Sequence, residues 1–164
     1  ARRDGAMTSP EPDSTIPARP EDSAAAALFD AIATEHATIY GYGVVSAHSV
    51  PEVNYLVSTA IAEHRARREA AIELAEQQGF AVAVPAAGYQ MPMEIDSSAD
   101  ATNLAVRMEE DAAVAWRAVV EQATDQSVRA FGVTAVSECA VTAAQWRVIR
   151  GDKTVTVAFP GGSE

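Results

Sequence analysis

One carboxylate interrupts an apolar helix face near the start of the chain. Leu28, Ile32, Ile39 and Tyr42 recur at the three- and four-residue spacing of one side of an α-helix, and Glu35 lies in the middle of that side. A charged group on a core-facing side needs an ionic partner, a proton or a metal ion. Glu35 therefore predicts a buried polar site.

Three later segments repeat the pattern. His64 lies among the apolar positions of the second such segment, and either Arg67 or Arg68 shares its side. Glu109 lies on the apolar side of the third segment, or Glu110 replaces it if the helical phase differs by one residue. Glu138 holds the corresponding place in the fourth, within a series of apolar and small residues: Val128, Phe131, Ala135, Thr142 and Ile149.

Four helices are expected to position these groups. We predict helices over residues 21–49, 51–78, 96–123 and 124–150, with acidic residues, Pro51 and a Ser97-x-x-Asp100 capping box at the starts. Gly79 and Gly151 are suitable terminators. The polar groups lie near the helix midpoints, so in a bundle of similar helices they should converge at one depth.

The segment from residue 79 to residue 95 is too rich in proline and glycine for a continuous helix and too apolar for a loose linker. Extended, such a segment spans about 55 Å, whereas a helix of this size is about 40 Å long. It can therefore cross the whole bundle and make the second and third helices parallel. A short strand over residues 81–84 is the less favoured alternative.

This arrangement resembles the ferritin-like superfamily over residues 22–150, and more narrowly an alanine-rich bacterial ferritin-like family of unknown function. The narrower resemblance lies in Glu35-His36-Ala37-Thr38-Ile39-Tyr40 and His64-Arg65-Ala66-Arg67-Arg68. It implies an all-α four-helix bundle of up-down-down-up topology with a long crossover between helices two and three. By position, it also implies Glu35, Glu109 and Glu138 as counterparts of di-iron ligands.

The chain departs from the di-iron pattern because it has no Glu-x-x-His sequence; Ala66 and Val141 stand where the histidines would be. An inward arginine would neutralise the carboxylates directly. We therefore favour a metal-free polar network without a catalytic residue or cofactor, formed by Glu35, His64, Arg67, Arg68, Glu109 and Glu138. The alternative is an iron- or manganese-binding oxidase or iron-handling protein, with Glu35, His64, Glu109 and Glu138 as ligands. An arginine inside the site favours the first interpretation.

Composition excludes several classes of partner. The 164 residues are 48% hydrophobic and carry a net charge of -11, which argues against nucleic-acid and anionic-membrane partners. Alanine is abundant, as in closely packed helices. One cysteine, Cys139, excludes an internal disulfide and fits the cytoplasm. We expect it to be buried and inert, Trp116 and Trp146 to be packing residues, and His36 to lie at the surface.

The two ends differ in character from the bundle. Residues 1–20 are expected to form a disordered arm, with Met7 as the natural start and residues 1–6 left over from cloning. Apolar and polar residues alternate within residues 151–164, as they do in a β-strand, so this segment should form an extended tail. We expect it to lie on its own bundle; the alternative is an arm that reaches a second subunit. Small helix-face residues and this tail suggest a homodimer.

Overall fold

The computed structural model describes residues 16–162, and they form four long helices and one short turn of 3-10 helix. These are α1 (Ser23–His48), η1 (Pro51–Val53), α2 (Asn54–Gln77), α3 (Ser98–Gln122) and α4 (Gln126–Arg150). The described part contains no strand, including over residues 81–84. The four helices are confirmed; the expectations for residues 1–15 and 163–164 lie outside the described residues.

Short polar side chains set where three of the helices begin. Asp22 Oδ2 accepts from the backbone N–H of Ala25 at 3.0 Å, and Ser97 Oγ accepts from that of Asp100 at 3.1 Å. Asp125 caps α4 in the same way. Gly151, which has a φ of 86°, ends α4 in the left-handed conformation that favours glycine.

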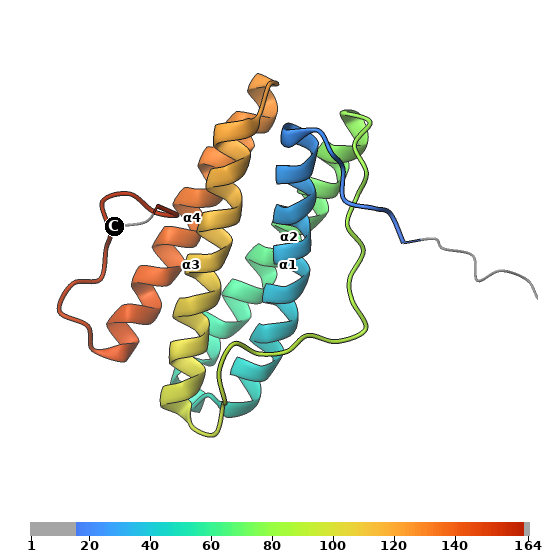
Figure 1. The fold of residues 1–164 in the computed structure, drawn as a ribbon. Coiled ribbons are helices and arrows are strands. Elements are labelled where there is room, and N and C mark those ends of the chain that lie inside the picture. Colours follow the sequence, from blue (N-terminus) through green and yellow to red (C-terminus); the bar gives the residue numbers. More distant parts are fainter. Residues whose placement is uncertain (1–15, 163–164) are drawn as a thin grey trace, which may run out of the picture.

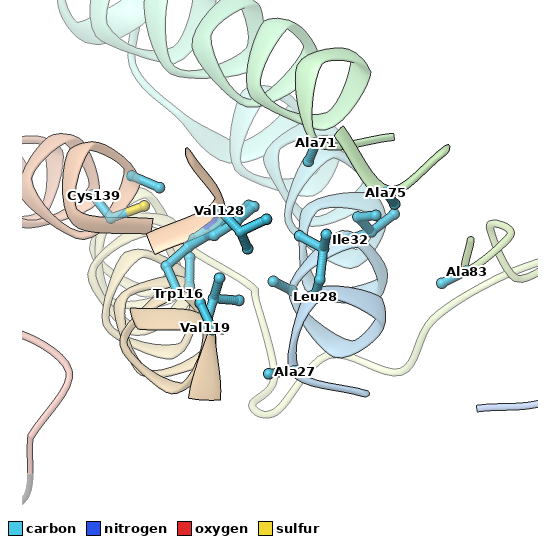
Figure 2. Close-up of a cluster of buried hydrophobic side chains, with 14 of the residues drawn as sticks. Ala27, Leu28, Ile32, Ala71, Ala75, Ala83, Trp116, Val119, Val128 and Cys139 are labelled. Atoms are coloured by element: carbon cyan, nitrogen blue, oxygen red, sulfur yellow. The ribbon is translucent and has the colours of Figure 1, made fainter. Parts of the chain in front are cut away.

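Two hydrophobic clusters fill the bundle, one toward each end. The first contains Leu28 and Ile32 of α1 and the large side chain of Trp116 of α3 (Figure 2). The second contains Leu56 of α2 and Trp146 of α4. Each helix passes from one cluster to the other, and the predicted polar residues lie between the two.

The order in which the helices meet these clusters shows their directions. α1 and α4 pass from the first cluster to the second, whereas α2 and α3 pass from the second to the first. α2 and α3 therefore begin at the same end of the bundle, as Figure 1 shows. Pairs that are adjacent in sequence, α1 with α2 and α3 with α4, run in opposite directions.

Residues 78–97 connect α2 to α3 and follow the outside of α1 from one end to the other (Figure 1). His36 Nε2 lies 3.0 Å from the backbone oxygen of Ala83, and the rings of Tyr40 and Tyr89 have centroids 5.3 Å apart. The expectation that His36 is a surface residue was wrong: its exposed fraction is 7%. The connecting segment covers it, which no helical pattern could predict.

The bundle is tightly packed on three sides and open on the fourth. α3 packs extensively against α1 and α4, and α1 packs against α2, whereas α2 and α4 touch at few positions. A groove therefore runs between α2 and α4.

The C-terminal segment packs against its own bundle. Arg147 Nη1 donates to the backbone oxygen of Val155 at 3.0 Å. Gly161, with a φ of 75°, lies so close to the backbone oxygen of Ala113 that a Cβ there would be 2.5 Å from it. None of the helices in the described range is long and apolar enough to cross a membrane.

Candidate functional site

His64 lies at the centre of the polar layer between the two clusters. Its Nδ1 is 2.6 Å from Glu35 Oε2, and its Nε2 is 2.8 Å from Glu109 Oε1. All three side chains are almost completely buried, with exposed fractions of 0% for both glutamates and 1% for the histidine. One imidazole on α2 thus joins a carboxylate of α1 to a carboxylate of α3.

Arg67 lies one helical turn after His64 and extends the layer to α4. Its Nη2 donates to Glu138 Oε2 at 2.8 Å, and its Nη1 makes a longer bond of 3.4 Å to Glu35 Oε1. The exposed fraction of Arg67 is 6%. The guanidinium therefore links a buried carboxylate to one at the edge of the bundle.

Aromatic side chains complete the layer by donating hydrogen bonds. Trp116 Nε1 donates to Glu35 Oε1 at 2.7 Å, and the Tyr42 hydroxyl donates to Glu109 Oε1 at 2.5 Å. Trp146 Nε1 in turn donates to the Tyr42 oxygen at 2.9 Å. The expectation that the two tryptophans only pack was incomplete, because each indole also satisfies a buried acceptor.

The buried layer contains charged groups of both signs. Burial opposes the protonation of His64, but its hydrogen bonds with Glu109 and Glu35 outweigh burial and raise its pKa to about 9. Burial also opposes ionisation of Glu35, yet His64 and Arg67 lower its pKa overall. Near neutral pH the core therefore holds two cations, His64 and Arg67, beside the carboxylate of Glu35.

A doubly protonated His64 determines how its contact with Arg67 must be described. Arg67 Nη1 lies 3.1 Å from His64 Nδ1, but both nitrogens carry protons in the charged state. This is a close contact between like charges and not a hydrogen bond. The carboxylates around the two cations make it tolerable, and removal of one carboxylate would leave the cations in opposition.

The structure brings four of the predicted residues together and places Glu138 nearer the surface. Glu35, His64, Arg67 and Glu109 meet in the core, and Arg67 is the inward arginine. Glu138 was expected in the core but its side chain is 52% exposed, and it reaches inward only through Arg67. Cys139 takes the buried position on α4 instead. The buried face of this helix keeps Val128, Ala135 and Thr142 as predicted, but it passes through Cys139 rather than Glu138.

The remaining alternatives lie outside the core. Arg68 binds its neighbour Glu69, with Nη2 2.7 Å from Glu69 Oε1. Glu110 pairs with Arg147 at 2.7 Å. Arg68 was therefore wrong as a member of the polar network, and Glu109 rather than Glu110 is the buried carboxylate of α3.

Cys139 and Tyr42 belong to the surroundings of this layer although the sequence did not indicate it. Burial raises the pKa of the Cys139 thiol well above its usual value, and Glu109 adds to the effect. Burial and Glu109 likewise raise the pKa of the Tyr42 hydroxyl. Both groups are therefore neutral, and Cys139 is buried as expected. Tyr42 could have been found as a hydroxyl two turns after Glu35 on the same helix face.

Residues 27–164 match the family described as Domain of unknown function (DUF4439). The chain belongs to this family. A solved structure of a conserved hypothetical protein, rv2844, from Mycobacterium tuberculosis is similar to it, with 52% sequence identity and a TM-score of 0.77. The similarity covers 79% of this chain and 98% of that one. A comparison with curated proteins gave no significant match.

The polar layer of this DUF4439 domain does not suit the di-iron centre that a ferritin-like resemblance implies. Both ring nitrogens of His64 bind carboxylates, so neither is free to bind a metal ion. The guanidinium of Arg67 also binds Glu35, and a metal ion beside it would bring a second positive charge close to the first. Within residues 16–162, no group of three or more His, Cys, Asp or Glu side chains is arranged to hold a metal ion. The donor set therefore fits ion pairs better than metal coordination.

Proposed function

We propose that this DUF4439 protein is a non-catalytic helical bundle of ferritin-like, up-down-down-up topology, in which an ion-pair layer takes the place of a metal centre. The helix directions and the long connection beside α1 support that topology. The observation that carries the functional part is Arg67: a permanently charged guanidinium is buried beside His64 and bonded to Glu35. It supplies, without a metal, the positive charge that the carboxylates need.

Such a layer makes one arrangement of the helices more favourable than others. A shift of any helix by one turn would leave a buried charge without its partner, at a cost of about 3–5 kcal/mol for each broken pair. The layer joins all four helices through Glu35, His64, Arg67, Glu109 and Glu138. Its role would then be to hold the register of a scaffold in the cytoplasm.

Elemental analysis tests the proposal. The protein is expressed in medium supplemented with iron and manganese, purified without a metal-affinity step, and compared with a Glu35→Ala variant. We expect metal far below one ion per chain in both proteins, and no binding of added iron. Near-stoichiometric metal that disappears in the Glu35→Ala variant would overturn the proposal.

A second candidate is the metal-binding oxidase or iron-handling protein, and one observation favours it. Within the described part of the chain, Glu109 Oε2 is buried and has no hydrogen-bond partner. A metal ion would be a partner for that oxygen, and iron or manganese would suit a carboxylate and histidine donor set. The same elemental analysis decides between the two candidates, followed by an oxygen-consumption assay if metal is found.

We also infer that the protein is a homodimer that uses the face formed by α3 and the C-terminal segment. Val114, Val157 and Phe159 have exposed fractions of 54%, 44% and 68% and lie around one hollow of about 360 Å³. Exposed apolar side chains grouped in this way are typical of interfaces. Light scattering at micromolar concentration should give twice the chain mass; a monomer mass would contradict the inference.

A further inference from the structure

Two arginines near the surface of this protein each bind an aspartate through the edge formed by Nε and Nη2. Arg19 uses both nitrogens on Asp30, at 2.8 and 2.7 Å, and Arg150 uses both on Asp152, at 2.8 and 2.6 Å. This two-pronged geometry is the strongest way in which a guanidinium holds a carboxylate. In these two pairs, both Nε and Nη2 of the guanidinium donate to oxygens of one carboxylate.

The same edge of Arg67 is only half occupied. Nη2 donates to Glu138 Oε2 at 2.8 Å, but Nε is buried and has no hydrogen-bond partner anywhere in residues 16–162. A buried donor without an acceptor is unfavourable by about 1–3 kcal/mol. Glu138 is also the one carboxylate of the layer whose side chain is substantially exposed. It can therefore swing away into solvent and leave the whole edge to another acceptor.

Arg67 also lines a cavity in the groove between α2 and α4. The cavity has a volume of about 280 Å³, and Ala66, Phe131 and Ala135 give it an apolar wall. A neighbouring hollow of about 380 Å³ continues along the same two helices. Sites for drug-sized molecules begin near 300 Å³, so this cavity suits a smaller organic molecule.

The charges around the cavity limit what that molecule can be. Arg67 attracts a carboxylate, but Glu63 and Glu138 also line the cavity, and the chain carries a net charge of -11. A simple anion would be repelled by both acids. A molecule with a carboxylate and an ammonium group satisfies both signs, because its ammonium group can face Glu63 or the displaced Glu138.

We propose that the groove between α2 and α4 binds a free α-amino acid with a small apolar side chain. Its carboxylate would take the place of Glu138 and occupy both Nε and Nη2 of Arg67, while its side chain packs on Phe131 and Ala135. One carboxylate replaces another, so the charge around Arg67 is unchanged. The inference goes beyond a scaffold role and requires Arg67 in its present position.

The ligand class is tested with three molecules that share the branched apolar part of leucine and differ in their charged groups. L-Leucine, 4-methylpentanoate without the ammonium group, and 3-methylbutylamine without the carboxylate are titrated into protein dialysed against EDTA, with binding followed by NMR chemical shifts. Leucine should bind best, 4-methylpentanoate more weakly, and the amine not detectably. Binding of the amine as tight as that of leucine, or no binding of leucine, would overturn the proposal.

Variants test the residues. In Glu138→Ala the competing carboxylate is gone, so the affinity for 4-methylpentanoate should rise about tenfold. Glu76→Ala, which removes an exposed carboxylate of α2 outside the groove, is the matched control and should leave the affinity unchanged. Arg67→Met should abolish binding; if that variant does not fold, Glu138→Ala decides, and an unchanged affinity there contradicts the proposal. Metal content is measured separately, so failure of this inference is distinguishable from failure of the scaffold proposal.

Discussion

Similar ionic groups occur in two settings in this protein, the layer at the centre of the bundle and the pairs along the outside of α3. Glu35, His64 and Glu109 are almost completely buried, whereas Arg107 and Asp111 are both about half exposed and meet at 3.1 Å. Water stabilises each exposed charge whether or not it is paired. In the core each charge depends on its partner, so burial rather than distance determines how much a pair matters.

The largest effect should follow from removing one buried carboxylate. Glu35→Ala leaves His64 and Arg67 close together without the acid between them, and it leaves the Trp116 indole without its acceptor. We expect the free energy of unfolding to fall by about 3–5 kcal/mol in urea denaturation.

Glu35→Gln is the control for this change, because it keeps the size and an acceptor for Trp116 but removes the charge. It should be less destabilising than Glu35→Ala. A loss below about 1 kcal/mol in the alanine variant would show that the buried layer behaves like a surface pair.

The second largest effect should be the loss of stability when His64 loses its proton at high pH. The pKa of His64 is raised from 6.5 to about 9, so its stabilising contribution is complete below pH 6.5 and is lost as the pH rises through 9. This loss is roughly 3 kcal/mol, from 1.36 kcal/mol for each pKa unit. The pKa of Glu35 is lowered, so its contribution is present above its ordinary pKa of 4.5 and is lost as the pH falls further.

Urea denaturation at several pH values measures this profile, with maximum stability expected between pH 4.5 and 6.5. The His64→Gln variant should lose the decline between pH 6.5 and 9. An unchanged free energy of unfolding across that range in the unmodified protein would rule out a charged His64 in the core.

The smallest effect is expected at the surface of α3. Asp111→Asn removes the charge opposite Arg107, four residues earlier on the helix, and should change the free energy of unfolding by less than about 0.5 kcal/mol. The change should also shrink further in 0.5 M salt. A loss comparable to that of Glu35→Ala would contradict the distinction between the two settings.

Local patterns in the sequence were sufficient for the helices and for part of the layer. Helix periodicity, the capping residues and the terminating Gly151 depend on neighbours within a few positions, so they can be read from the chain. Glu35, His64 and Glu109 could be found because an isolated polar residue on an apolar helix face conflicts with burial. The conflict is local, and it identifies the residue without identifying the partner.

Only the tertiary structure decided how the layer is completed. Arg67 and Arg68 are adjacent, and a small rotation of α2 determines which one enters the core. The packing of α4 buries Cys139 and leaves Glu138 half exposed. The two tryptophans are large apolar residues that are expected in a core in any case, so the sequence pattern gave no sign of their hydrogen bonds. The open groove between α2 and α4 depends on how helices distant in sequence pack, which no single segment encodes.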